Sequence, residues 1–197
     1  MFINATGFYV PEERVDNQHF LELNGLTSEW IEQRTGIRSR SKAKAEENIN
    51  TMSMEAVRNA LPKLPYDITD VDLIVSASYS PYDTVATAAH LAQHEFHIEN
   101  AKALYLSSAC SSFLNALEVV EGYFAMGKAT KALILSADKN SAYYNETDLG
   151  RCGCGLLHLE GTRFGKGFRD RGSIHTRTWL SGQGSGCGTS SSVRRGD

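Results

Sequence analysis

The sequence predicts an α/β protein built on a largely parallel sheet, and two observations carry this prediction. Short apolar runs alternate with segments of helical periodicity along residues 1–138, as in consecutive strand–helix–strand units. In the run DVDLIVS at Asp70–Ser76, apolar residues, several of them β-branched, follow one another instead of alternating with polar ones. This pattern is typical of a parallel strand covered on both faces. Ligands of such sheets bind beyond the carboxyl ends of the strands, so functional residues are expected there.

The elements are expected in a fixed order along the chain. Strands are predicted at Phe2–Tyr9, Asp70–Ser76, Ala103–Leu106 and Ala132–Leu135. Helices are predicted at Asn17–Leu23, from a cap at Thr27 or Ser28 onward, across Met52–Leu61, at Thr87–Phe96 and at Ser111–Met126. Turns or stops are predicted at Asn24–Gly25, Gly36, Pro62 and Gly127. The charged segment Ser39–Asn50 is expected to be exposed.

The helix predicted at Ser111–Met126 is unusually apolar. The only residues suited to a solvent-exposed side of this helix are Asn115, Glu118 and Glu121. A helix that is apolar on nearly every side is typically buried, so we expect this one inside the fold.

Cys110 lies where the third predicted strand ends and this helix begins. There its sulfur would face the first backbone N–H groups of the helix and the positive end of the helix dipole, which favour a thiolate nucleophile. A cysteine beside an apolar helix can equally be a small core residue. The small neighbours Ser107–Ala109 and Ser111–Ser112 leave space around the sulfur and place hydroxyls at the N-cap, which favours the nucleophile.

Composition narrows the class of protein. With 197 residues, 41% hydrophobic and 22% charged, the chain has the make-up of one soluble domain with a core. No apolar run approaches the roughly 20 residues that span a bilayer, and the N-terminus lacks the pattern of a signal peptide. A net charge of −3 indicates no nucleic-acid partner. Four cysteines are too few for a disulfide framework and favour the reducing cytoplasm.

Two further clusters have alternative interpretations. Arg34, Arg38 and Arg40 surround Gly36, and they form either a solvated face or a phosphate site beside Trp30, on which a base could stack. His90 and His94 are four residues apart, with His97 close by, but no third ligand motif accompanies them. We therefore predict a helix face and no metal.

Five stretches together resemble a known family: GFYVPEERVDN, SEWIEQRTGIRSR, DVDLIVSASYSP, SSACSSFLNAL and KALILSADKNSAYYN. In the same order, they look like the N-terminal half of a β-ketoacyl-ACP synthase III, a condensing enzyme of the thiolase fold. The resemblance implies a thiolase-like N-terminal half over residues 1–149, with a mixed, largely parallel sheet and a buried helix carrying the nucleophile. It also implies a homodimer when full length.

The same resemblance implies an acyltransferase of fatty-acid or polyketide biosynthesis. Cys110 matches the cysteine that takes an acyl group from an acyl-CoA primer, and Trp30 and Arg34 match positions that hold the nucleotide end of coenzyme A. The acyl group is then condensed with malonyl-ACP, whose CO₂ is lost. No cofactor besides these substrates is implied, nor a nucleic-acid or membrane partner. The catalytic His and Asn of the family lie in its second half.

Some positions depart from the family pattern. An arginine that clamps the adenine is replaced around Ala142, and Val85 stands where a larger aromatic residue lines the primer pocket. A wider pocket for longer or branched acyl groups is therefore expected. Two alternatives remain open: a hydroxymethylglutaryl-CoA synthase-like enzyme that condenses without decarboxylation, and a non-catalytic fragment that dimerises through its sheet edge.

Residues 150–197 break the pattern. They are rich in Gly, Arg and Ser, show no helical or alternating period, and lack the family's second half. Read one base later, the degenerate codons of Leu156–Phe164 allow YFISKERVS and those of Gly182–Ser192 allow GKGPDVGHLRP. We therefore predict an out-of-frame tail without a domain of its own, in which Cys152, Cys154 and Cys187 have no designed role. A lone half would also expose the apolar surface around Phe113–Met126.

Overall fold

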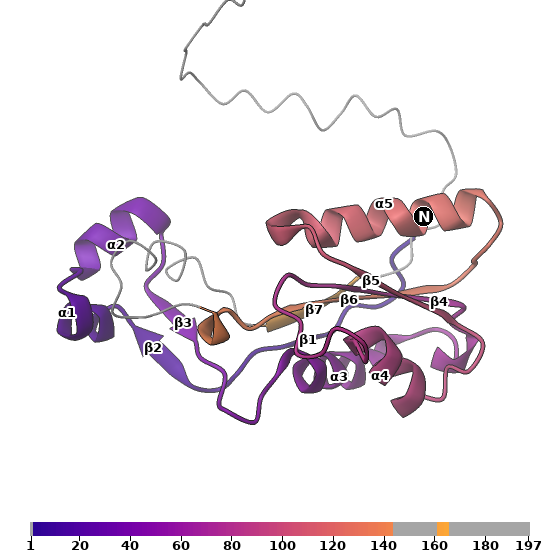
Figure 1. The fold of residues 1–197 in the computed structure, drawn as a ribbon, viewed down its shortest axis with the longest axis horizontal. Coiled ribbons are helices and arrows are strands. Elements are labelled where there is room, and N and C mark those ends of the chain that lie inside the picture. The colour runs from indigo at the N-terminus through magenta and orange to yellow at the C-terminus, as the bar shows by residue number, and fades with distance from the viewer. Residues whose placement is uncertain (1, 144–160, 166–197) are drawn as a thin grey trace, which may run out of the picture.

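A computed structural model describes residues 2–143 and, as backbone, residues 161–165 (Figure 1). The strands are β1 Phe8–Tyr9, β2 Arg14–Asp16, β3 Ser39–Ser41, β4 Leu73–Ala77, β5 Lys102–Leu106, β6 Ala132–Asp138 and β7 Gly161–Gly165. The α-helices are α1 Gln18–Asn24, α2 Ser28–Thr35, α3 Ile49–Ala60, α4 Ala88–Glu95 and α5 Ser112–Ala125. Short 3₁₀ turns are η1 Leu61–Lys63, η2 Ile68–Asp70, η3 Ala109–Ser111 and η4 Asn140–Ala142.

The main body is a five-stranded sheet of order β1-β7-β6-β4-β5. β4 lies parallel to both β5 and β6, with Val75 opposite Leu104 on one side and Ile134 on the other. β7 runs antiparallel to β6 and β1. All five residues of β4 are buried, which confirms a parallel strand in this stretch, although it begins at Leu73 rather than Asp70, because Asp70 belongs to η2.

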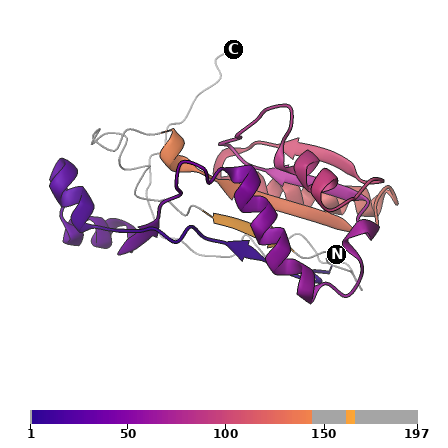
Figure 2. The same ribbon diagram turned by 90° about the horizontal axis from the view of Figure 1, so that it is seen from below.

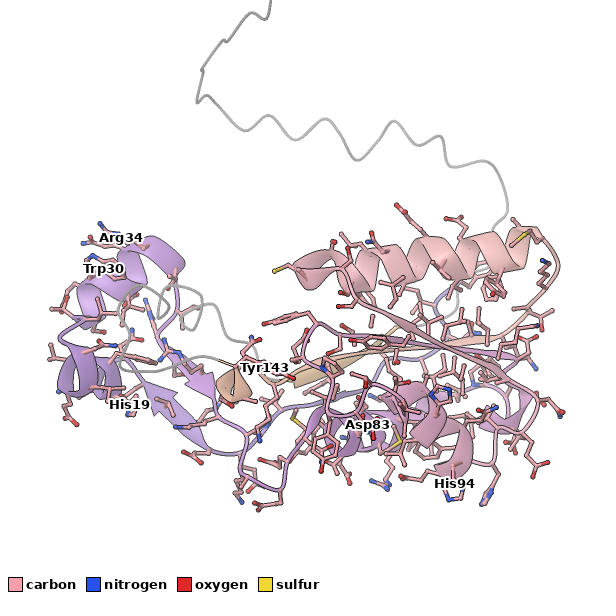
Figure 3. All side chains as sticks on the ribbon, in the orientation of Figure 1. His19, Trp30, Arg34, Asp83, His94 and Tyr143 are labelled. Carbon is pink, nitrogen blue, oxygen red and sulfur yellow. The ribbon has the colours of Figure 1, made fainter. Side chains whose placement is uncertain are left out.

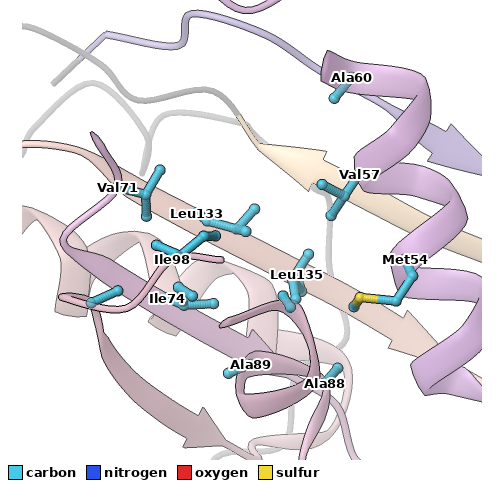
Figure 4. Close-up of a cluster of buried hydrophobic side chains, with 12 residues drawn as sticks. Met54, Val57, Ala60, Val71, Ile74, Ala88, Ala89, Ile98, Leu133 and Leu135 are labelled. Carbon is cyan, nitrogen blue, oxygen red and sulfur yellow. The ribbon is translucent and has the colours of Figure 1, made fainter. Parts of the chain in front are cut away.

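One face of the sheet is covered by α3 and α4, which Figure 2 turns toward the reader. Side chains from both helices and from β4 and β6 close into a single apolar cluster (Figure 4). Ile74 and Leu133 are fully buried in it. Arg58 of α3 pairs with Glu95 of α4 at the margin, so the two helices also contact each other through charged side chains.

Of the described elements, α5 is the one that covers the opposite face (Figure 1). Only Ser112, Ala116 and Val120 of this helix are buried: Ala116 and Val120 pack against the sheet, and Ser112 is bonded within the preceding turn. Leu114 is 61% exposed and Met126, just past the helix, is 59% exposed. The predicted burial of the helix is therefore correct for its inner side and wrong for its outer side, because no other described element packs there. The apolar exposure expected for a lone half is observed.

A small lobe stands apart from the sheet and contains β2, β3, α1 and α2 (Figure 1). Thr27 caps α2 by accepting a 3.2 Å hydrogen bond from the Trp30 backbone N–H, as predicted. α1 and α2 end at Gly25 (φ +79°) and Gly36 (φ +70°), whose left-handed backbone favours glycine. Both predicted helix ends are confirmed.

Three local predictions need correction. The first strand is only Phe8–Tyr9, rather than Phe2–Tyr9. The segment Ser39–Asn50 is not uniformly exposed, because β3 pairs with β2 and turns Arg40 inward, where it is 4% exposed. α3 begins at Ile49, since Asn48 and Thr51 form a capping box that the hydrophobic pattern did not reveal.

β7 lies inside the stretch for which no strand was predicted. It is placed by its two partners, β1 and β6, rather than by a pattern of its own. Apart from this backbone, residues 150–197 lie outside the described residues, as do Cys152, Cys154 and Cys187, so the domain boundary at 149/150 and the out-of-frame tail stay predictions. Among the residues that are described, no helix is both long and apolar enough to cross a membrane.

Candidate active site

Cys110 is the middle residue of η3, the single 3₁₀ turn that links β5 to α5. Its side chain is exposed. Ala109, directly before it, has φ +46°, a left-handed backbone that residues with a Cβ rarely adopt. This sharp turn presents the thiol at the head of α5, as the sequence predicted.

Serine hydroxyls stabilise the turn around Cys110. Ser112 Oγ accepts from the Ser108 backbone N–H and donates to the Ala109 carbonyl, both at 2.7 Å. Ser111 Oγ donates to the Ser108 carbonyl, also at 2.7 Å. The prediction that these hydroxyls serve the N-cap is wrong, because the N-cap residue of α5, Ser111, makes no capping hydrogen bond. The serines fix the turn instead.

The turn lies at the carboxyl edge of the parallel strands, on the side of the sheet nearer the small lobe (Figure 1). A polar cluster at this edge was not predicted. Asp138, at the end of β6, accepts hydrogen bonds from Ser78 Oγ at 2.9 Å, the Tyr79 backbone N–H at 3.0 Å and Ser80 Oγ at 3.0 Å. Tyr105 donates to the Ser78 carbonyl at 2.7 Å. The segment after β4 is thereby fastened to β5 and β6.

The loop after Ser80 is fixed at a second carboxylate. Asp83 accepts the backbone N–H groups of Val85 at 2.7 Å and Ala86 at 3.0 Å, and these hydrogen bonds hold the pKa of its carboxyl below the usual range. Val85 is 82% exposed on this loop. A small cavity beneath the loop is lined in part by Ser76 and Thr87.

Trp30 and Arg34 lie together on the outer tip of the small lobe (Figure 3). They are four residues apart on α2, and the Arg34 guanidinium lies 4.3 Å from the centre of the indole ring. Trp30 is 37% exposed. The pair forms a partly exposed surface that combines a flat aromatic ring with a positive charge.

The predicted basic cluster does not form a single surface. Arg38 is exposed and pairs with Glu32 at 2.7 Å, Arg34 stacks on Trp30, and Arg40 is buried. The turn at Gly36 and the pairing of β3 send the three side chains in different directions.

The histidines of α4 do not assemble a metal site. His90 Nδ1 lies 3.0 Å from Thr87 Oγ1, while His94 points away from the body (Figure 3). In the part of the chain that the structure describes, no group of three His, Cys, Asp or Glu side chains is arranged to hold a metal ion.

Comparison with known proteins identifies the family. The family profile described as 3-oxoacyl-[acyl-carrier-protein (ACP)] synthase III matches residues 105–157, a range that includes Cys110 and α5. β-Ketoacyl-[acyl-carrier-protein] synthase III from Pasteurella multocida is 36% identical over 163 residues, covering 80% of this chain and 51% of that protein. This chain belongs to the β-ketoacyl-ACP synthase III family.

Solved structures of the synthase III family have the same thiolase-like fold. The enzyme from Aquifex aeolicus superposes with a TM-score of 0.79 at 30% identity, over 86% of this chain and 54% of that chain. A priming β-ketosynthase of a polyketide pathway gives a TM-score of 0.76 at 28% identity, over 83% of this chain and 48% of that one. The chain thus spans about half the length of the synthase III relatives that it matches.

Proposed function

We propose that this chain performs the acyl-transfer step of a synthase III, with Cys110 as the residue that is acylated. The observation that carries this proposal is the exposed thiol at the strand–helix turn, on the carboxyl edge of a parallel sheet. The Cys110 thiolate attacks the carbonyl carbon of an acyl-CoA thioester, and the tetrahedral intermediate collapses with loss of the coenzyme A thiolate. The product is an acyl-cysteine, and no resident cofactor takes part.

Trp30 and Arg34 are proposed to bind the nucleotide end of coenzyme A. Their stacked arrangement and exposure support this role, because an adenine can lie against a flat aromatic or guanidinium surface while the positive charge attracts phosphate.

In the full-length enzyme, the acyl group would be condensed with malonyl-ACP in fatty-acid or polyketide biosynthesis, by a cytoplasmic homodimer. This step needs groups that stabilise the enolate formed when CO₂ leaves, and the family resemblance locates these groups in the second half. We therefore propose that this chain alone accepts an acyl group but releases little or no CO₂ from malonyl-ACP.

The test is incubation of the chain with acetyl-CoA and mapping of the acetylated peptide by mass spectrometry. Acylation is expected at Cys110, and the Cys110→Ser variant should lose it while Cys152, Cys154 and Cys187 stay unmodified. Labelling spread equally over the four cysteines, or none at Cys110, would refute the proposal.

Repeating the assay with longer and branched acyl-CoA thioesters tests whether Val85 accompanies a wider primer range, which a strict preference for acetyl-CoA would contradict.

A further inference from the structure

The small lobe has little apolar core to fix its shape. Its buried apolar cluster consists of Phe20 and Ile31, with Val15 and Leu26 half-buried against them. The cluster between the sheet and the helices α3 and α4 is several times larger. Because apolar burial is the main source of rigidity in a folded domain, polar contacts must determine how the elements of this lobe are arranged.

Arg40 occupies the centre of the lobe. It is 4% exposed, and its Nη2 donates to Asn17 Oδ1 at 2.9 Å. Its Nη1 lies 3.3 Å from the carbonyl oxygens of Val15 and Asp16, and the guanidinium lies 4.6 Å from the centre of the Phe20 ring. Only a planar, forked cation makes all of these contacts at once.

Asn17 extends this contact to α2. It is 2% exposed, and its Nδ2 donates to the Ile37 carbonyl at 2.9 Å and lies 3.3 Å from Ser28 Oγ. Ser28 is the first residue of α2, and Ile37 follows its last residue, Thr35, by two positions. The amide of Asn17 therefore contacts both ends of the helix, and Arg40 holds that amide in place.

We infer that Arg40 and Asn17 are positioning residues for the coenzyme A nucleotide, acting through α2 on Trp30 and Arg34. Because the Asn17 amide is bonded to the first residue of α2 and to the carbonyl just beyond its C-cap, rotation of the helix about its axis would strain or break one of these bonds. The direction in which the stacked pair faces is thus fixed from inside the lobe, without contact between Arg40 and the ligand. The inference rests on the proposed function of Trp30 and Arg34.

The test compares two acyl donors for Cys110: acetyl-CoA and the acetyl thioester of N-acetylcysteamine, which lacks the nucleotide. In Arg40→Met, the half-saturating concentration of acetyl-CoA should rise about tenfold, the order expected when hydrogen bonds to a charged group are lost. The maximal acylation rate and the reaction with the nucleotide-free thioester should not change. Arg40→Lys should recover part of the effect, because an ammonium can reach Asn17 Oδ1 but not both carbonyl oxygens as well.

Arg14→Met is the matched control. Arg14 lies on the neighbouring strand β2, is exposed, and donates only to Ser41 Oγ at 3.1 Å, so its loss should change the half-saturating concentration less than about twofold. Hydrogen exchange of the α2 amides, measured without ligand, should be faster in Arg40→Met than in Arg14→Met.

The outcomes separate the inference from the function on which it rests. If the unaltered chain reacts equally well with both thioesters, the proposed role of Trp30 and Arg34 fails and the positioning role fails with it. If the unaltered chain prefers acetyl-CoA and Arg40→Met keeps that preference, only the positioning role fails. If Arg40→Met reduces acylation equally with both thioesters, Arg40 is needed for folding alone, which also overturns the inference.

Discussion

The two faces of the sheet differ in how completely they are covered. On one face, α3 and α4 close over a continuous cluster that includes the fully buried Ile74 and Leu133. On the other face, α5 covers Val75 and Ile134 with its inner side and leaves Leu114 in solvent. Within the described residues, the first face is closed, whereas the second keeps large apolar side chains exposed, as surfaces that contact another protein segment do.

The turn that carries Cys110 lies on the less covered side, since it leads directly into α5. The family comparison agrees with this division, because the chain spans about half the length of its synthase III relatives. The closed face therefore should set the stability of the chain, and the open face should set its association and chemistry.

The largest effect is expected on the closed face. Leu133→Ala removes a fully buried side chain and leaves a cavity, so the free energy of unfolding should fall by about 2–5 kcal/mol. Urea unfolding measures this loss. Leu114→Ala, on the open face, should cost less than about 0.5 kcal/mol. Similar losses at both positions would contradict the division between the faces.

Substitutions at two glycines, one beside each face of the sheet, test the same difference in packing. A Cβ at Gly7 would lie 2.1 Å from the Ala56 carbonyl oxygen in α3, so Gly7→Ala should destabilise the chain by about 1–3 kcal/mol. A Cβ at Gly122 in α5 meets nothing within 4 Å, and Gly122→Ala should stabilise the chain by about 0.5–1 kcal/mol. Thermal melting of both variants checks the opposite signs. A stabilising Gly7→Ala would mean that the chain at Gly7, just before β1, does not lie close to α3.

The Tyr9–Glu47 hydrogen bond, at the margin of the face covered by α3 and α4, should contribute to the free energy of unfolding in a pH-dependent way. Tyr9 donates a hydrogen bond to Glu47, which together with burial raises the pKa of Tyr9 from 10.0 to about 12. Stability from the neutral phenol is thus complete below pH 10.0 and is lost as the pH rises toward about 12.

At low pH, the stability that this hydrogen bond provides depends on the protonation of Glu47. Burial raises its pKa, but the hydrogen bonds from Tyr9 and from the Lys44 backbone N–H outweigh burial, so the pKa lies below 4.5. Its contribution is present above pH 4.5 and is lost as the pH falls through the lowered value. Unfolding of Tyr9→Phe and the unaltered chain across this range should differ most between pH 4.5 and 10.0. A difference independent of pH would exclude the Tyr9–Glu47 contact as its source.

The smallest effect on stability is expected from Leu114→Ser. Because Leu114 is 61% exposed, the free energy of unfolding should change by less than about 0.5 kcal/mol. Self-association at high concentration, measured by sedimentation velocity, should nevertheless decrease, since an apolar patch has been interrupted. Unchanged association would show that the outer side of α5 is not a contact surface.

The sequence was most informative where structure depends on neighbouring residues. The buried run of β4, the cap at Thr27 and the stop at Gly25 are local signals, and each prediction was confirmed. β7 and the burial of Arg40 depend on partners far along the chain, and neither was predicted.

The candidate site divides in the same way. Cys110 was found from a local pattern of small residues between a strand and a helix. For Trp30 and Arg34, the residues alone left a solvated face and a phosphate site both open, and the family resemblance favoured the second. The Asp138 cluster and the Arg40–Asn17 contact join segments that lie 58 and 23 residues apart, so they emerge only once the chain is folded.

The left-handed backbone of Ala109 affects both the stability of the chain and the freedom of the Cys110 side chain. An alanine in that region costs about 1–2 kcal/mol relative to a right-handed conformation, and glycine would remove most of that cost. Selection for heat resistance alone would therefore favour glycine beside Cys110. The same exchange would give the thiol more freedom of direction, so durability and reactivity compete at a single position.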